Sequence, residues 1–239
     1  MKHLTPTHQY ELDPNGIEDS FTNGLCLDAI KVGSSSMKGQ VIGLWLEARV
    51  SALVAQWLPN WVCSHAQITD ANDTTMQSRT WDVVVHRPIP TGFGYPPPSH
   101  PPHGYPLVPK HLCCALINVK GNLSPSQLRA AMNEPAYQGT EDSTIKQMDY
   151  LGPDLPKIYL CFTSYASERA MSDAAIECGV EAFTLARLNT RRKSLDGRAV
   201  YHWTLNRTRS GDLPLTSFRQ CLEGHARRRE ERDASKSRR

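Results

Sequence analysis

Four polar side chains stand where the surrounding sequence is apolar: Glu47, Asp82, Asn118 and Lys120. Carboxylates are the ligands that a hard cation such as Mg²⁺ favours, and an asparagine oxygen can add a neutral ligand. Asn118 and Lys120 are two residues apart at the end of an apolar run, so on a strand they point to the same side. These four residues are therefore the first candidates for a reactive site.

The elements that carry these residues follow from the spacing of apolar side chains. Glu47 lies in a predicted helix, residues 36–58, on or beside the stripe of apolar residues that recurs with a 3.6-residue period. Asp82 opens the apolar part of a predicted strand at 80–86, and Asn118 and Lys120 end another at 112–120. An acid on a helix, an acid on a strand and an N-x-K pair on a following strand could converge on one spot.

The rest of the chain alternates strand and helix patterns, which predicts an α/β fold with a central mixed β-sheet flanked by helices. Further strands are predicted at 61–69, 157–165, 180–188 and 199–205, further helices at 124–133, 168–178 and 214–230, and irregular chain at 134–156. Ser124-Pro125 has the pattern of a helix start, and Gly179 that of a helix end.

The predicted organisation has three parts: a loosely structured lead-in at 1–35, the α/β domain at 36–226 and a basic tail at 227–239. Residues 87–110 contain nine of the 17 prolines, so we expect an exposed loop there. Its proline runs could adopt a polyproline II conformation and bind a protein partner. His100 and His103 in this loop are poorly arranged for zinc, which needs fixed ligands.

Several short motifs occur together in one order. They are Gly43 four residues before Glu47, Leu58-Pro59, Ser78 four residues before Asp82-Val83-Val84, and Ile117-Asn118-Val119-Lys120 followed by Leu123-Ser124. In this order they resemble the PD-(D/E)XK, or restriction-endonuclease-like, nuclease superfamily, and within it an uncharacterised bacterial and phage domain family. The resemblance covers residues 38–133 and extends loosely to about 205.

The resemblance implies a restriction-endonuclease-like fold and metal-dependent cleavage of phosphodiester bonds. Asp82 and Asn118, supported by Glu47, would hold Mg²⁺ or Mn²⁺, and Lys120 would position the nucleophile or neutralise charge. The chain departs from the superfamily pattern at Asn118, where a Glu or Asp is usual. Losing that carboxylate should weaken Mg²⁺ binding, and Glu47 could partly compensate.

Positive charge is concentrated toward the C-terminus although the whole chain carries only +3. Residues 187–209 hold seven Lys and Arg against one acid, whereas residues 1–186 hold 12 against 18. Such a cluster predicts contacts with nucleic-acid phosphates, and a solvated loop is the competing interpretation. The candidate phosphate contacts are Arg187, Arg191, Arg192, Lys193 and Arg198.

Other features narrow the range of functions. The seven cysteines are odd in number and form no CxxC pair, and most lie in apolar runs, which favours a reducing, cytoplasmic location. No apolar run approaches the ~20 residues of a membrane span. The sequence also lacks a Gly-rich phosphate loop, a G-x-S-x-G and an H-E-x-x-H motif.

The sequence thus predicts a metal-dependent nuclease acting on DNA or RNA, with Glu47, Asp82, Asn118 and Lys120 at its centre. Two alternatives stay open: an inactive nuclease-fold module that binds nucleic acid or a protein, and an assembly subunit. Each candidate also has an ordinary structural interpretation. Asp82 could bond a turn, Glu47 could pair with Arg49, Lys120 could extend into solvent and Asn118 could bond the backbone.

Overall fold

A seven-stranded mixed sheet forms the centre of the molecule, with strand order β3-β1-β2-β4-β5-β6-β7. The computed structural model describes residues 24–25, 39–70, 78–89, 106–133, 147–193, 199–208 and 211–236, with the backbone alone at 39–42, 147–148, 189–193 and 199–204. The strands are β1 (Val62–Thr69), β2 (Trp81–His86), β3 (Leu107–Pro109), β4 (Cys113–Asn122), β5 (Lys157–Ser164), β6 (Glu181–Lys193) and β7 (Ala199–Leu205).

Both parallel and antiparallel pairs occur in this sheet. β4, β5 and β6 run parallel, while β1–β2, β2–β4 and β6–β7 are antiparallel. β5 is buried along its whole length, as expected for a central parallel strand with both faces covered. The prediction of an α/β fold with a mixed sheet is confirmed.

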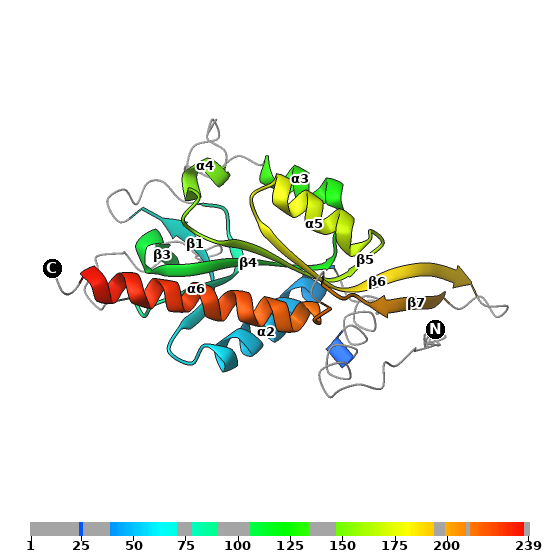
Figure 1. The fold of residues 1–239 in the computed structure, drawn as a ribbon, viewed down its shortest axis with the longest axis horizontal. Helices are drawn as coiled ribbons and strands as arrows, with labels where there is room; N and C mark the ends of the chain where they lie inside the picture. Colours follow the sequence, from blue (N-terminus) through cyan, green and yellow to red (C-terminus); the bar gives the residue numbers. More distant parts are fainter. Residues whose placement is uncertain are drawn as a thin grey trace.

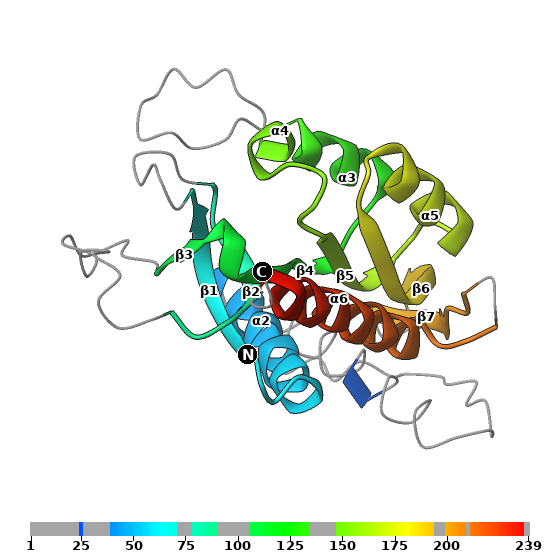
Figure 2. The same cartoon turned by 60° about the vertical axis from the view of Figure 1, so that its left-hand side comes forward.

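Helices cover both faces of the sheet (Figure 1). α2 (Gly39–Trp57) and the long α6 (Pro214–Lys236) lie on one face, and α3 (Pro125–Met132) and α5 (Glu168–Glu177) lie on the other. Figure 2 shows the same layers from a second direction, with the short α4 (Gln147–Leu151) on the side of α3 and α5. The ends of β6 and β7 extend beyond the helical layers (Figure 1).

The core under α2 and α6 is the largest apolar cluster in the described chain. Val83, Val85, Ile117 and Val119 point from the sheet into this cluster. Leu46, Val50 and Val54 of α2 and Phe218 and Leu222 of α6 meet them. This packing fixes the face of α2 that carries Glu47 against the sheet.

Two helix boundaries follow the chemistry that the sequence predicts. Ser124 caps α3 through a full capping box with Gln127, and Pro125 occupies the first turn. Gly179 follows α5 with a φ of +64°, a left-handed conformation that favours glycine. The predicted start of α3 and end of α5 are confirmed.

Other boundaries differ from the predictions. Leu107–Pro109 forms an edge strand within the predicted proline-rich loop and pairs in parallel with β1; Pro109 is tolerated because β3 lies at the sheet edge. The short α4 interrupts residues 134–156, for which the sequence predicts irregular chain. α6 continues to Lys236, past the predicted end near 230, with an Arg229–Asp233 ion pair along its last turns. Most of the predicted lead-in and most of the proline-rich loop lie outside the described residues.

Candidate metal-binding site at the β2 bulge

Glu47 projects from α2 toward β1. Its side chain is 18% exposed, and its Oε2 lies 3.0 Å from Nδ1 of His65 on β1. Leu46 and Val50 on either side are buried in the cluster between α2 and the sheet. The helix is therefore held by its apolar face while Glu47 lies at the margin of that face.

A β-bulge in β2 turns Asp82 to the same side of the sheet. Ser64 pairs with Val84 and Ala66 with Trp81, so Asp82 and Val83 together oppose the single residue His65. The apolar clusters show the same interruption of alternation in β2. Trp81 and Val84 pack in one cluster, while Val83 packs in the cluster beneath α2. Regular alternation would have placed Trp81 and Val83 on one face. Bulges re-aim side chains in this way and are frequent beside functional sites.

β4 fixes the Asp82 carboxylate from the other side. The backbone N–H of Val119 donates a 2.7 Å hydrogen bond to Asp82 Oδ2. The Nζ of Lys120 lies 3.9 Å from the same oxygen and is partly exposed. Asp82 is thus held by the strand that carries Lys120.

His65 completes a group that the sequence pattern alone does not reveal. One ligand atom each of Glu47, His65 and Asp82 lies within 4.8 Å of the others. The available signal is the position of His65 in the strand between the Glu47 helix and the Asp82 strand, but its meeting with Asp82 depends on the bulge. Two carboxylates and an imidazole form a donor set that suits Mn²⁺ and accommodates Mg²⁺ with added waters.

The two carboxyl groups share an unfavourable electrostatic setting. Burial raises the pKa of Glu47, and the neighbouring Asp82 carboxylate raises it further, against the opposing effects of His65 and Lys120. Burial also raises the pKa of Asp82, opposed first by Lys120 and then by the Val119 N–H. A bound cation would relieve the repulsion between these two carboxylates and favour their ionised forms.

Asn118 lies on β4 and makes no hydrogen bond with this group among the described residues. Ile117 and Val119 face the cluster beneath α2, so alternation directs Asn118 to the opposite side of the strand. Its Oδ1 is buried and has no hydrogen-bond partner among the described residues. A metal-ligand role for Asn118 therefore stays a prediction, whereas Glu47, Asp82 and Lys120 are brought together.

The predicted phosphate contacts are only partly described. Arg187 is exposed on β6, and Arg191, Arg192 and Lys193 continue the same strand, where the backbone alone is described. Arg198 lies outside the described residues, as do His100 and His103. No described helix is long and apolar enough to cross a membrane.

Comparison with known proteins identifies the class of fold. No family model and no curated protein matches the chain. Among solved structures, the cAAA-bound form of NucC from E. coli MS115-1 is similar, with a TM-score of 0.53 and 13% identity over 86% of this chain and 88% of that one. The chain has a restriction-endonuclease-like fold.

A second structure supports the same restriction-endonuclease-like fold. The cAAA-bound form of NucC from P. aeruginosa ATCC27853 has a TM-score of 0.52 and 13% identity, over 86% of this chain and 89% of that one. At this identity the likeness concerns the fold alone. The predicted fold class is confirmed.

Proposed function

We propose that this protein is a metal-dependent nuclease that cleaves phosphodiester bonds in DNA or RNA. The observation that carries the proposal is the meeting of Glu47, His65 and Asp82 within 4.8 Å, with Lys120 Nζ 3.9 Å from Asp82. The restriction-endonuclease-like fold supports it, because the cluster joins a helix acid, a strand acid and a lysine in the order typical of that superfamily.

Each residue has a role that follows from its position. Glu47 and Asp82 would provide charged oxygen ligands, and His65 a nitrogen ligand. A bound Mn²⁺ or Mg²⁺ would supply an activated water and neutralise charge on the scissile phosphate. Lys120 lies next to Asp82 with its ammonium partly exposed, so it can contact a phosphate oxygen or orient the attacking water.

The three proposed ligands compensate for the absence of a carboxylate at position 118, where this chain has an asparagine. His65 and Glu47 lie on the α2 side of the sheet with Asp82, so three side chains can hold one cation without a second acid on β4. We propose that Asn118 acts through its buried Oδ1, bonding an ordered water rather than the metal.

Metal binding tests this proposal independently of cleavage. Titration of the full chain with Mn²⁺, followed by electron paramagnetic resonance, should give one site in the native protein. Glu47→Gln should weaken it by at least ~10-fold, because it removes a charged ligand while keeping the shape of the side chain. Glu177→Gln, an exposed acid on α5, is the matched control and should bind as the native protein does. Equal affinity in all three proteins would refute the site.

A second candidate function rests on Asn118. A nuclease fold that lacks one carboxylate could instead be a module that binds nucleic acid or a protein without cutting. In that case Asn118→Glu would create cleavage in a chain that has none, and the native protein would still bind nucleic acid.

A further inference from the structure

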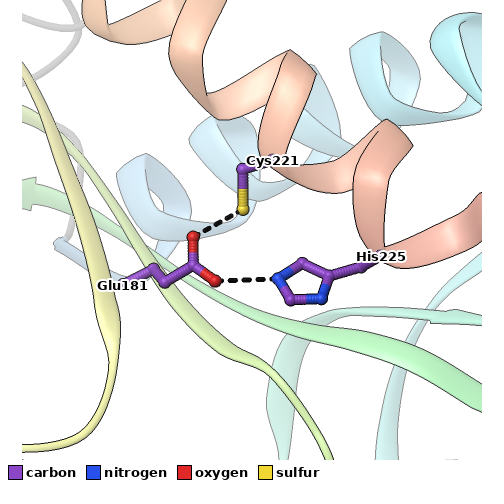
Figure 3. Close-up of side chains that lie close together, drawn as sticks. All are labelled: Glu181, Cys221 and His225. Carbon is purple, nitrogen blue, oxygen red and sulfur yellow. Dashed lines mark hydrogen bonds and ion pairs between the residues drawn. The ribbon is translucent and has the colours of Figure 1, made fainter. Parts of the chain in front are cut away.

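A second cluster of metal-ligating side chains lies where α6 meets β6, away from the β2 bulge. Glu181 begins β6, and Cys221 and His225 lie one turn apart on α6. Figure 3 shows the Glu181 carboxylate between the thiol and the imidazole. Cys221 Sγ donates to Glu181 Oε2 at 2.7 Å, and His225 Nε2 lies 2.7 Å from Oε1.

These three residues offer a convergent donor set from two elements. One ligand atom from each lies within 4.8 Å of the others. The i, i+4 spacing of Cys221 and His225 puts both on the face of α6 that meets the start of β6. His225 is mostly buried, at 14% exposed, whereas Glu181 is 43% exposed.

Nucleophilic chemistry does not suit this arrangement. The thiol bonds to the carboxylate and not to the imidazole, so His225 is not placed to accept its proton. A nucleophilic cysteine needs a thiolate favoured by positive surroundings, and the contact with Glu181 works against one. A dipositive ion would reverse this, because metal coordination deprotonates the thiol.

We propose that Glu181, Cys221 and His225 form a zinc-binding site that joins α6 to the start of β6. Thiolate, imidazole and carboxylate are all ligands of Zn²⁺, and the thiolate disfavours Mg²⁺, which prefers oxygen. Glu181 and His225 also line a surface cavity of about 340 Å³ with Lys157, Arg228 and Arg232, and a water from this cavity would supply the fourth ligand. Three protein ligands with one open position is the arrangement typical of catalytic zinc sites.

Arg228 sets a condition on binding. Its Nη2 lies 2.8 Å from His225 Nδ1, so without metal the ring carries its proton on Nε2, toward Glu181. Coordination through Nε2 moves that proton to Nδ1, and Arg228 must then turn away. Arg228 is exposed, so it has solvent to move into. The arginine therefore opposes zinc, and its removal should tighten binding.

Cobalt spectroscopy of the full chain tests this site. Co²⁺ should bind with one equivalent giving a sulfur-to-cobalt charge-transfer band, which Zn²⁺ then removes. Cys221→Ser should abolish the band, while Cys178→Ser, a half-buried thiol on the opposite face, should keep it. Arg228→Met should retain the band and bind Zn²⁺ more tightly, a result that does not depend on the folding of the cysteine variant.

The cobalt experiment reports on this site and not on the proposed site at the β2 bulge. Glu47, His65 and Asp82 include no sulfur and can give no sulfur-to-cobalt band. Glu47→Gln should therefore leave the charge-transfer band unchanged. Absence of the band in the native protein, or its persistence in Cys221→Ser, would overturn the proposal. Weaker zinc binding in Arg228→Met would also contradict it.

Discussion

Asp82 on β2 accepts a 2.7 Å hydrogen bond from the backbone N–H of Val119 on β4. The side chain of one strand thus replaces a backbone partner of the next, at the point where the bulge in β2 interrupts regular pairing. The bond fixes the carboxylate beside Lys120, whose Nζ lies 3.9 Å away. One aspartate therefore has both a structural and a proposed chemical role, and the two can be separated by mutation.

Asp82→Asn and Asp82→Ala should differ in stability. Asparagine keeps an oxygen for the Val119 N–H, whereas alanine leaves that donor without its partner, at a cost of about 1–3 kcal/mol. Burial raises the pKa of Asp82, so the ionised carboxylate itself is unfavourable in the fold, and Asp82→Asn should unfold no earlier than the native protein. Urea unfolding of the three proteins measures this. Equal midpoints for the two variants would show that the hydrogen bond contributes nothing.

Ser78 should be important for folding, not chemistry. Its buried Oγ accepts from the Ile68 N–H at 2.8 Å and donates to the Arg79 carbonyl at 2.7 Å. Ser78→Ala should therefore cost about 1–3 kcal/mol of unfolding free energy, because it leaves the buried Ile68 N–H without its partner. Ser172→Ala, on α5, is the control and should change stability by no more than about 0.5 kcal/mol. Metal affinity per folded molecule should be unchanged in both.

Lys157 should make stability depend on alkaline pH. The residue is 4% exposed, and its ammonium donates to the Gly152 carbonyl. Burial, with repulsion from Lys110, lowers the pKa of Lys157 from 10.5 to about 8. Between these values the folded chain binds fewer protons than the unfolded chain, so the unfolding free energy should rise with pH through this window.

Removal of the titrating group tests that slope. Lys157→Met should flatten the rise relative to the native protein when urea unfolding is measured between about pH 8 and 10. Lys236→Met, an exposed residue in the last turn of α6, should keep it. The same slope in Lys157→Met and in the native protein would contradict the assignment.

The end of β6, which carries Arg191 and Arg192, should contribute salt-dependent affinity for nucleic acid. Arg191→Gln with Arg192→Gln should weaken binding and reduce the dependence of log K on log salt by about 0.9 for each phosphate that is no longer neutralised. Arg129→Gln, on α3 and paired with Glu177, is the control and should leave the slope unchanged. Fluorescence anisotropy with a duplex at several salt concentrations measures it. An unchanged slope in the double variant would exclude these arginines from the interface.

The sequence predicts the layers of the fold because those depend on local patterns. The helix with Glu47, the buried strands and the Ser124 cap all follow from apolar spacing and turn chemistry. The sequence also selects Glu47, Asp82 and Lys120 as candidates for one site, since each lies at the margin of an apolar element, but their proximity depends on how distant strands pair. Long-range pairing decides the parts that differ, such as the edge strand at Leu107–Pro109.

The pairing register of β1 and β2 explains why the sequence does not predict the role of His65. The bulge that opposes Asp82 and Val83 to His65 depends on two strands paired at a distance, and nothing in TWDVVVH marks it. Without the bulge, Asp82 would face away from His65, which would meet Glu47 alone. Glu181 and His225 are 44 residues apart and meet only because α6 crosses the start of β6.

The most direct test of the proposed nuclease is cleavage of plasmid, single-stranded DNA and RNA in Mn²⁺ or Mg²⁺ by the native protein, Asp82→Asn and Asn118→Glu. We predict cleavage by the native protein and its loss, by at least ~100-fold, in Asp82→Asn, which keeps the Val119 hydrogen bond and removes only the charge. Cleavage that persists in Asp82→Asn would contradict the site. Cleavage by Asn118→Glu alone would contradict catalysis by the native chain and identify the inactive nuclease-fold module.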